Sequence, residues 1–183
     1  MRPTLETARL RLRPLREDDL DAYAALYADP DVVRYLEGRV LSRDEAWRNL
    51  ALVVGHWELR GFGLWAVEER ESGEMVGRIG HWQPEGWPGF EIGWLLARSR
   101  WGLGYATEGA RAALADAFVR LGRDSVISVI HPDNAASIRV AGRIGERFER
   151  RATVRGFDVE IHRIDRAAWE RGAAEAPRAG PCP

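Results

Sequence analysis

The stretch that decides the fold of this chain is Glu91-Ile-Gly-Trp-Leu-Leu-Ala-Arg-Ser-Arg-Trp-Gly-Leu-Gly-Tyr-Ala-Thr-Glu108. It places an apolar strand, a short basic turn with two glycines and the start of a helix in direct succession. Backbone N–H groups point inward in such a turn and the helix N-terminus adds partial positive charge, so the turn can hold a pyrophosphate. A tight turn that binds nothing explains the two glycines equally well.

A second motif further along the chain favours the anion-binding interpretation. It runs His131-Pro-Asp-Asn-Ala-Ala-Ser-Ile-Arg-Val-Ala-Gly-Arg-Ile-Gly145, from the end of a short apolar strand into a helix. Asn134 is a natural N-cap, and Ser137 stands at position N3 of the first helical turn. A purely structural role for both residues is the alternative, and the two roles are compatible.

Hydrophobic periodicity around these motifs predicts a mixed α/β domain with one central sheet over residues 1–171. Residues 172–183 are rich in Ala, Pro and Gly, and we expect them to form a flexible C-terminal tail. The capping box that opens at Ser42 predicts a helix that ends near Gly61. The other predicted helices cover residues 17–27, 107–121 and 134–144, and the predicted strands cover 9–15, 63–69, 75–82, 90–96, 125–130, 147–154 and 158–165.

The composition excludes several classes of chemistry. All 27 cationic residues are arginine, so neither a Schiff-base lysine nor a P-loop lysine exists. The single cysteine, Cys182, excludes an intrachain disulfide, and no histidine pair has metal-ligand spacing, so we expect no metal. A net charge of −1 and a pI near 6.5 give no global electrostatic case for nucleic acid. No apolar run has transmembrane length, so we expect no membrane partner and a cytoplasmic location.

The first motif resembles a known signature. Its residues Trp101-Gly-Leu-Gly-Tyr-Ala106 are similar to Q/R-x-x-G-x-G/A, the acyl-CoA pyrophosphate signature of the GNAT superfamily of N-acyltransferases. The helix opened by Asn134-x-x-Ser137 is similar to the second CoA-contacting helix of that superfamily. Together with the segment 5–15, the form Trp-Gly-x-Gly-Tyr-Ala-Thr-Glu resembles the RimJ/RimL-like branch, named for ribosomal-protein N-terminal acetylation. The resemblance covers residues 5–167.

The resemblance implies both a fold and an activity. The fold is the GNAT fold, a central mixed, mostly antiparallel sheet of about seven strands flanked by helices, with a splayed acyl-CoA cleft. The activity is acetyl-CoA-dependent N-acetyl transfer, made directly to a primary amine in a ternary complex. A protein or peptide N-terminus is the leading acceptor. The alternatives are a small-molecule amine, such as an antibiotic or polyamine, and a non-catalytic acyl-CoA-binding sensor. Analogy with the superfamily, in which homodimers are common, is the single argument for a homodimer.

The resemblance also assigns residues to the acetyl-CoA site. They lie on the strand that precedes the first motif, in the glycine turn, and on the helix of the second motif. Two of them, Arg139 and Arg143, lie on this helix, and the alternative to CoA binding for both is a position on a solvated helix face. The complete set is Trp94, Leu95, Leu96, Arg100, Trp101, Gly102, Leu103, Gly104, Tyr105, Ala106, Asn134, Ser137, Arg139 and Arg143.

Glu91 is the predicted general base. A carboxylate between aromatic neighbours has its pKa raised toward values useful at neutral pH. The alternative for Glu91 is a position on a solvated strand face without a catalytic role. His81 is the second candidate for the base, although a lone strand histidine is often structural. Ser137 is the predicted acid for the departing thiolate. His81, Trp82 and Trp87 are expected to line the acceptor side.

Two positions depart from the family pattern. Trp101 stands where the signature has Gln or Arg, which removes one polar phosphate partner. The helical tyrosine that many members use as the acid falls at Ala141, so that role is open to another residue.

Overall fold

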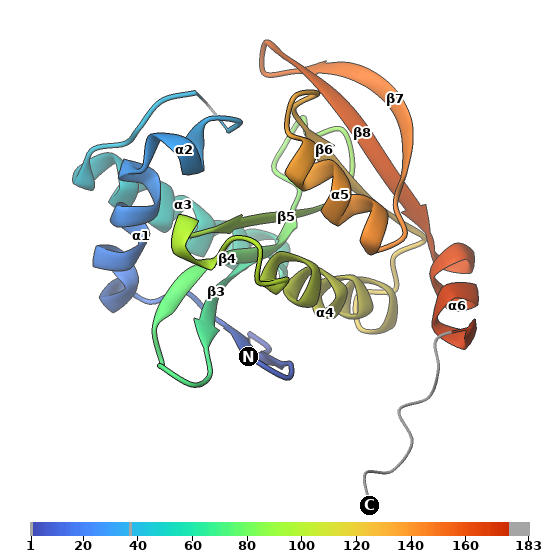
Figure 1. The fold of residues 1–183 in the computed structure, drawn as a ribbon, viewed down its shortest axis with the longest axis horizontal. Helices are drawn as coiled ribbons and strands as arrows, with labels where there is room; N and C mark the ends of the chain where they lie inside the picture. Colours follow the sequence, from blue (N-terminus) through green and yellow to red (C-terminus); the bar gives the residue numbers. More distant parts are fainter. Residues whose placement is uncertain (1, 37, 176–183) are drawn as a thin grey trace, which may run out of the picture.

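The computed structural model describes residues 2–36 and 38–175 and has one sheet at its centre (Figure 1). The strands lie in the spatial order β1-β2-β3-β4-β5-β6-β8-β7, and every neighbouring pair is antiparallel except β5 with β6. The predicted mixed, mostly antiparallel sheet is therefore confirmed, with eight strands where about seven were expected. The strands are β1 Leu5–Glu6, β2 Leu10–Arg13, β3 Leu64–Glu69, β4 Met75–Trp82, β5 Glu91–Leu96, β6 Ser125–Ile130, β7 Arg147–Val154 and β8 Phe157–Asp165.

Local capping sets the helix boundaries. The predicted capping box opens α3: Glu45 Oε2 accepts from the Ser42 N–H at 2.9 Å, and α3 ends at Gly61 with a left-handed φ of 74°. Asn134 caps α5 through a 3.1 Å bond from the Ser137 N–H to its Oδ1. The α-helices are α1 Leu20–Ala28, α2 Pro30–Val33, α3 Arg43–Arg60, α4 Tyr105–Val119, α5 Ala135–Arg143 and α6 Arg166–Glu175, with short 3-10 turns at Glu17–Asp19 and Arg98–Arg100.

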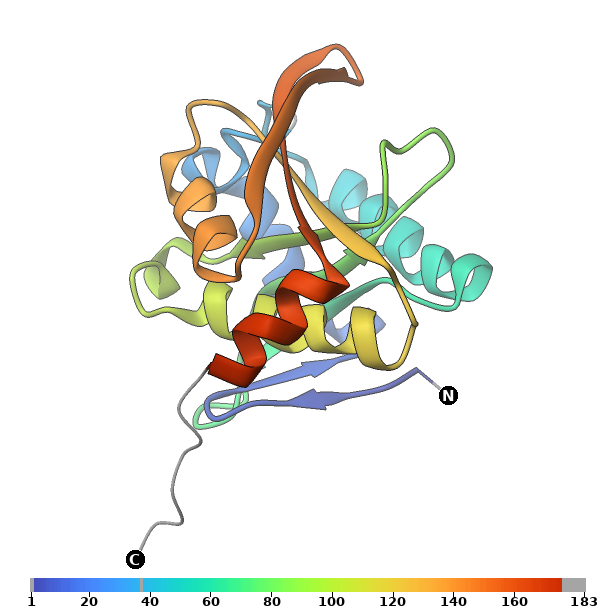
Figure 2. The same cartoon turned by 90° about the vertical axis from the view of Figure 1, so that its right-hand side faces the viewer.

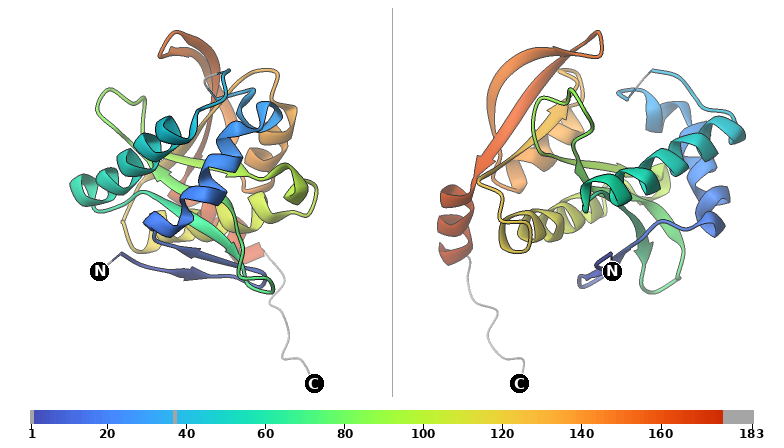
Figure 3. Two further views of the ribbon diagram at one scale, coloured as in Figure 1. Left: turned by 90° about the vertical axis from the view of Figure 1, so that its left-hand side faces the viewer. Right: turned by 180° about the vertical axis from the view of Figure 1, so that it is seen from behind.

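Helices cover both faces of the sheet. Helices α1 and α3 cross one face (Figure 3), where Tyr23 and Leu50 form a core with the β5 residue Leu95. Helix α4 covers the other face, where Leu114 packs with Ile92 of β5. The β1–β2 hairpin lies beside α4, and α6 lies at the end of β8 (Figure 2). The two faces of β5 therefore belong to two separate cores.

The start of α4 and the extent of α6 differ from the sequence prediction. Helix α4 begins at Tyr105, two residues before the predicted start. Helix α6 continues to Glu175, so residues 172–175, predicted as the beginning of a flexible tail, are helical. The rest of the predicted tail, 176–183, lies outside the described residues. Across the ranges 2–36 and 38–175, no helix has the length and apolar character that a bilayer crossing requires.

Candidate active site

Strands β5 and β6 part from one another almost as soon as they meet. Glu91 pairs with Ile127, and this is the single register pair between the two strands in the described part of the chain. Beyond it, side chains take over two of the hydrogen bonds that the ladder would have made. Ser128 Oγ donates to the Ile92 carbonyl at 2.9 Å, and Glu91 Oε1 accepts from the Val129 N–H at 3.4 Å. The result is the splayed cleft expected from the resemblance.

Glu91 stands at the point where the strands part. It is only 8 % exposed, and its Oε2 accepts a 2.6 Å hydrogen bond from Trp87 Nε1. Burial raises the pKa of Glu91 to about 7, while the Trp87 and Val129 hydrogen bonds and the Arg78 charge act in the opposite direction. Glu91 is therefore not on a solvated strand face, and a carboxyl with this pKa can take up a proton near neutral pH.

A second buried carboxyl, Glu146, lies near Glu91. It is 1 % exposed, its Oε1 lies 3.1 Å from Ser128 Oγ, and its Oε2 has no partner among the described residues. Ser128 has a single hydroxyl proton, which is shared between two acceptors, the Ile92 carbonyl oxygen and Glu146 Oε1. Burial, together with the Glu91 charge, raises the pKa of Glu146 well above its ordinary value and so favours the neutral carboxyl.

The glycine turn presents a row of free backbone donors. Gly102 and Gly104 have left-handed φ values of 78° and 84°, and Gly104 is the N-cap of α4 without a side-chain cap. Among the described residues, no N–H from Gly102 to Thr107 has a hydrogen-bond acceptor. Free N–H groups at the N-terminus of a long helix fit a pyrophosphate, so the residues present match the predicted CoA turn.

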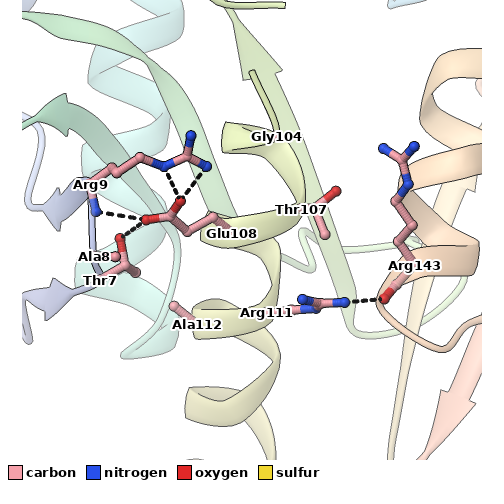
Figure 4. Close-up of a pocket in the computed structure, with 9 residues that line it drawn as sticks. All are labelled: Thr7, Ala8, Arg9, Gly104, Thr107, Glu108, Arg111, Ala112 and Arg143. Carbon is pink, nitrogen blue, oxygen red and sulfur yellow. Dashed lines mark hydrogen bonds and ion pairs between the residues drawn. The ribbon is translucent and has the colours of Figure 1, made fainter. Parts of the chain in front are cut away.

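A pocket of about 720 Å³ opens beside the N-terminal half of α4 (Figure 4). Arg9 reaches across from the β1–β2 turn: its Nε donates to Glu108 Oε2 at 2.8 Å and its Nη1 to the Leu103 carbonyl at 2.9 Å. Thr107 contributes a buried hydroxyl without a partner among the described residues. Thr7, Ala8, Gly104, Arg111, Ala112 and Arg143 complete the lining. A cation and an unpaired hydroxyl beside the free N–H groups favour an anionic ligand here.

The structure brings the two predicted CoA elements together. Trp94 Nε1 on β5 donates to Ser137 Oγ on α5 at 3.1 Å. Because Ser137 Oγ accepts this bond, its own proton is left for another partner, as the predicted role toward the thiolate requires. Ala141, where many family members have a tyrosine, is completely buried in α5.

Other predicted CoA residues are held in different ways. Trp101 and Leu103 are about half exposed, at 48 % and 49 %, and Trp101 Nε1 donates to the Leu96 carbonyl. Tyr105 is buried and donates to Glu69. Arg100 Nη2 is shared between two carboxylates, those of Glu69 and Glu74. Those Arg100 ion pairs measure 3.3 and 3.0 Å. Three more predicted residues are buried or partly buried beside the turn, namely Leu95, Leu96 and Ala106. The two predicted arginines of α5, Arg139 and Arg143, are exposed.

The assignment of His81 to the acceptor side is wrong. Its side chain is fully buried, and its Nε2 hydrogen-bonds to the Ala113 carbonyl of α4 at 2.9 Å. Burial lowers the pKa of His81 to about 4. Strand alternation explains the difference, because His81 points to the α4 face while the neighbouring Trp82 shares the opposite face with its register partner Glu91.

Trp82 and Trp87, which are predicted to line the acceptor side, both lie beside Glu91. Both are partly buried; Trp82 stacks on His56 with ring centroids 4.5 Å apart, and Trp87 bonds to Glu91. The sequence analysis missed three charged residues near Glu91, namely Arg78, Glu146 and Arg155. Only Arg78 carried a usable signal, since it alternates with Trp82 and so shares the Glu91 face. Within the described ranges, no group of three His, Cys, Asp or Glu side chains could hold a metal ion.

Comparison with known proteins agrees with this geometry. The model of the acetyltransferase (GNAT) domain family matches residues 9–147. The chain is 34 % identical to the Bacillus subtilis (strain 168) protein YkkB, over 90 % of this chain and 96 % of that protein. An acetyltransferase from Agrobacterium tumefaciens str. C58 superposes with a TM-score of 0.81 at 33 % identity, over 90 % of this chain and 95 % of that one.

A further neighbour shows the same fold with a ligand. RimL, a ribosomal L7/L12 alpha-N-protein acetyltransferase whose structure was solved in complex with coenzyme A, superposes with a TM-score of 0.75 at 20 % identity. The superposition covers 91 % of this chain and 99 % of the RimL chain.

Proposed function

Because the chain belongs to the GNAT acetyltransferase family, it is an acetyl-CoA-dependent acyltransferase, and we propose that Glu91 is its general base in direct transfer to a primary amine. The observation that carries this proposal is the position of Glu91. It is a buried carboxyl with a pKa of about 7, and it lies where β5 and β6 separate.

Each part of the cleft then has a chemical task. The free N–H groups of the glycine turn bind the pyrophosphate of acetyl-CoA. Glu91 takes one proton from the incoming ammonium, directly or through a water, so that the amine nitrogen can attack the thioester carbon. The nitrogen of the adduct loses its second proton to solvent water. As the C–S bond breaks, Ser137 Oγ–H, positioned by Trp94, supplies a proton to the leaving sulfur and regains one from solvent. Glu91 then releases its proton to solvent. A base of this kind contributes about 10²- to 10⁴-fold to the rate.

We propose that the acceptor is the N-terminal amine of a peptide or protein. The sequence resemblance to the RimJ/RimL-like branch supports this acceptor, and the activity named for the RimL neighbour agrees with it. A second acceptor class, small-molecule amines, uses the same chemistry and is separated from the first by the substrate tests below.

The test of the base is Glu91→Gln, because glutamine keeps an oxygen that can accept from Trp87 Nε1. With saturating acetyl-CoA and a peptide acceptor, the wild-type rate should rise with pH and level off above an apparent pKa near 7. The variant should lack this limb. Its deficit should reach about 10²-fold at pH 8 and become small near pH 5.5, where the wild-type carboxyl is itself protonated.

Binding of acetyl-CoA, measured by calorimetry, serves as the control and should be the same for both proteins. If the variant keeps the wild-type acid limb, the base is another group. If wild type binds acetyl-CoA but releases no thiol with any amine, the proposed transfer to an amine fails.

A further inference from the structure

Arg78 has no carboxylate partner among the described residues, and it lies on the sheet face that carries Glu91. It lies on β4 opposite Leu95, on the same sheet face as Glu91 and Trp82. Its Nε donates to the Tyr27 hydroxyl at 2.9 Å, and its Cζ lies 5.7 Å from the Tyr27 ring centroid. Among the described residues, no acid forms an ion pair with Arg78, and its two terminal nitrogens have no acceptor.

The acidic residues at the start of the nearby helix α2 already pair with other arginines. Asp29 and Asp31 face Arg98 at 3.5 and 3.2 Å, and Asp31 also pairs with Arg34 at 2.7 Å. The carboxyl whose charge Arg78 feels is Glu91, which is held by Trp87 instead. A partly buried guanidinium with free donors is the standard arrangement for binding a carboxylate.

Two glycines lie between Arg78 and Glu91 on the β4–β5 pair. Gly80 and Gly93 are direct register partners in the antiparallel β4–β5 pair, and both lie between the two charged residues. A Cβ added to Gly93 would contact one atom, Glu91 Oε1, at 3.6 Å. A Cβ added to Gly80 would instead meet the Gly63 carbonyl and the Trp65 ring, so the open space is at Gly93. An acceptor of a few atoms that lies over Gly93 can have one end at Glu91 and the other toward Arg78.

A second arginine reinforces the positive character near Glu91. Arg155, in the β7–β8 turn, places its Cζ 5.2 Å from the ring centroid of Trp87, the residue that bonds to Glu91. Within the described residues, no acid pairs with Arg155 either. Two arginines without acidic partners make this side unsuitable for a polycationic acceptor, because like charges would have to be brought together.

We infer that the acceptor carries a carboxylate in addition to its amine, and that Arg78 binds this carboxylate while Glu91 receives the amine. The inference rests on the proposed function, since it places the amine at Glu91. The carboxylate can come from an acidic residue close to a peptide N-terminus or from a free amino acid. Polyamines and aminoglycosides, which lack a carboxylate and carry several positive charges, are then poor acceptors.

The test compares acceptors that differ only in charge. The peptides Ser-Asp-Ala-amide and Ser-Asn-Ala-amide form one pair, aspartate and asparagine amide form another, and spermidine is the cationic probe. Wild type should prefer the acid in at least one pair by about 10- to 100-fold in kcat/KM, the range for one charge-assisted hydrogen-bonded contact. Whichever pair shows the preference identifies the source of the carboxylate.

Variants assign the preference to Arg78. Arg78→Gln should lower kcat/KM for the acidic acceptor to the level of its amide and leave the amide rate within about threefold. Arg78→Lys should keep part of the preference, because a cation remains. Arg34→Gln removes a neighbouring exposed charge that has its own partner, and it should change neither rate. The dissociation constant for acetyl-CoA reports that each variant is folded.

Two results would overturn the inference. One is a wild-type enzyme that acetylates amines without regard to acceptor charge, or that prefers spermidine. The other is an Arg78→Gln variant that loses the acid and the amide acceptor equally. In both cases amines are still acetylated, so the proposed transfer stands. If no amine of the panel is acetylated, the proposed function fails first.

Discussion

At the scale of single residues, the protonation of Glu91 depends on two opposing surroundings. Burial favours the neutral carboxyl, while the 2.6 Å hydrogen bond from Trp87 Nε1 favours the carboxylate. Glu146 is also buried nearby and has no N–H donor among the described residues, and its pKa is raised well above its ordinary value. The indole N–H of Trp87 is thus one of the groups that keep Glu91 usable as a base near neutral pH.

Replacing Trp87 by phenylalanine should raise the pKa of Glu91 above its present value of about 7. The acid limb of the pH–rate profile should move to higher pH, and the rate near pH 9 should change little. Trp82→Phe is the matched control, because Trp82 stacks on His56 and makes no hydrogen bond to Glu91. An unshifted limb in Trp87→Phe would mean that this hydrogen bond does not set the ionisation of Glu91.

Ser128 is the residue that closes the gap where β5 and β6 part. Ser128→Ala leaves the Ile92 carbonyl and the Glu146 carboxyl without their shared partner, and unpaired buried groups cost about 1–3 kcal/mol. Urea unfolding should show this loss in the free energy of unfolding. Ser125→Ala, on the same strand but partly exposed, should change it by less than about 0.5 kcal/mol. Equal losses for the two variants would remove the bridging role.

At the scale of elements, α4 has a left-handed glycine beyond each end, but only one is placed for binding. Gly104 precedes the helix with φ 84° and Gly122 follows it with φ 65°. An added Cβ at Gly104 would lie 3.5 Å from Nη2 of Arg9, which reaches over from the β1–β2 turn, whereas at Gly122 it would meet nothing within 4 Å.

Alanine at either glycine should cost about 1 kcal/mol of stability, since both positions force a left-handed backbone on a side chain. Only Gly104→Ala should weaken acetyl-CoA binding, by about tenfold or more, because it alters the turn that faces the pyrophosphate. Thermal unfolding and calorimetric titration measure the two effects separately. Equal affinities for acetyl-CoA in the two variants would refute the placement of the phosphate turn.

At the scale of the whole molecule, buried titratable groups make stability depend on pH. The pKa of Glu91 is raised from 4.5 to about 7, so between these values the folded state holds more protons than the unfolded state. Stability contributed by neutral Glu91 is present below pH 4.5 and is lost as pH rises toward 7. His81, with its pKa lowered to about 4, acts in the opposite direction, and its contribution is lost as pH falls from 6.5 to 4.

The difference between Glu91→Gln and wild type isolates the glutamate from the histidine. The variant should gain stability relative to wild type as pH rises from 4.5 to 7, by about 3 kcal/mol at most, and the gain should then level off. Chemical unfolding at pH 5, 6, 7 and 8 measures this gain. A difference that does not change with pH would mean that Glu91 has an ordinary pKa in the folded protein.

Much of the fold could be predicted because its causes are local. The capping box at Ser42, the asparagine cap at residue 134 and the alternating apolar residues of β3 to β6 act within a few residues of one another. The two-residue strand β1 and the helix α6 were not predicted. Strand β1 is defined by its pairing with β2, and the Trp169 ring of α6 packs against Phe118 of α4, so neither contact is visible in a local pattern.

By itself, the sequence determined the order of the strands β2 to β8 and of the helices α1, α3, α4 and α5, the glycine turn before α4 and the candidate set for the CoA site. Only the tertiary structure decided that Glu91 is buried beside Trp87, that His81 faces α4, and that Arg78 has no acidic partner among the described residues. The physical reason is that ionisation and pairing depend on which distant segments exclude water from a side chain. Periodicity tells which face a residue takes, but the neighbours that cover that face are set by the packing of the whole chain.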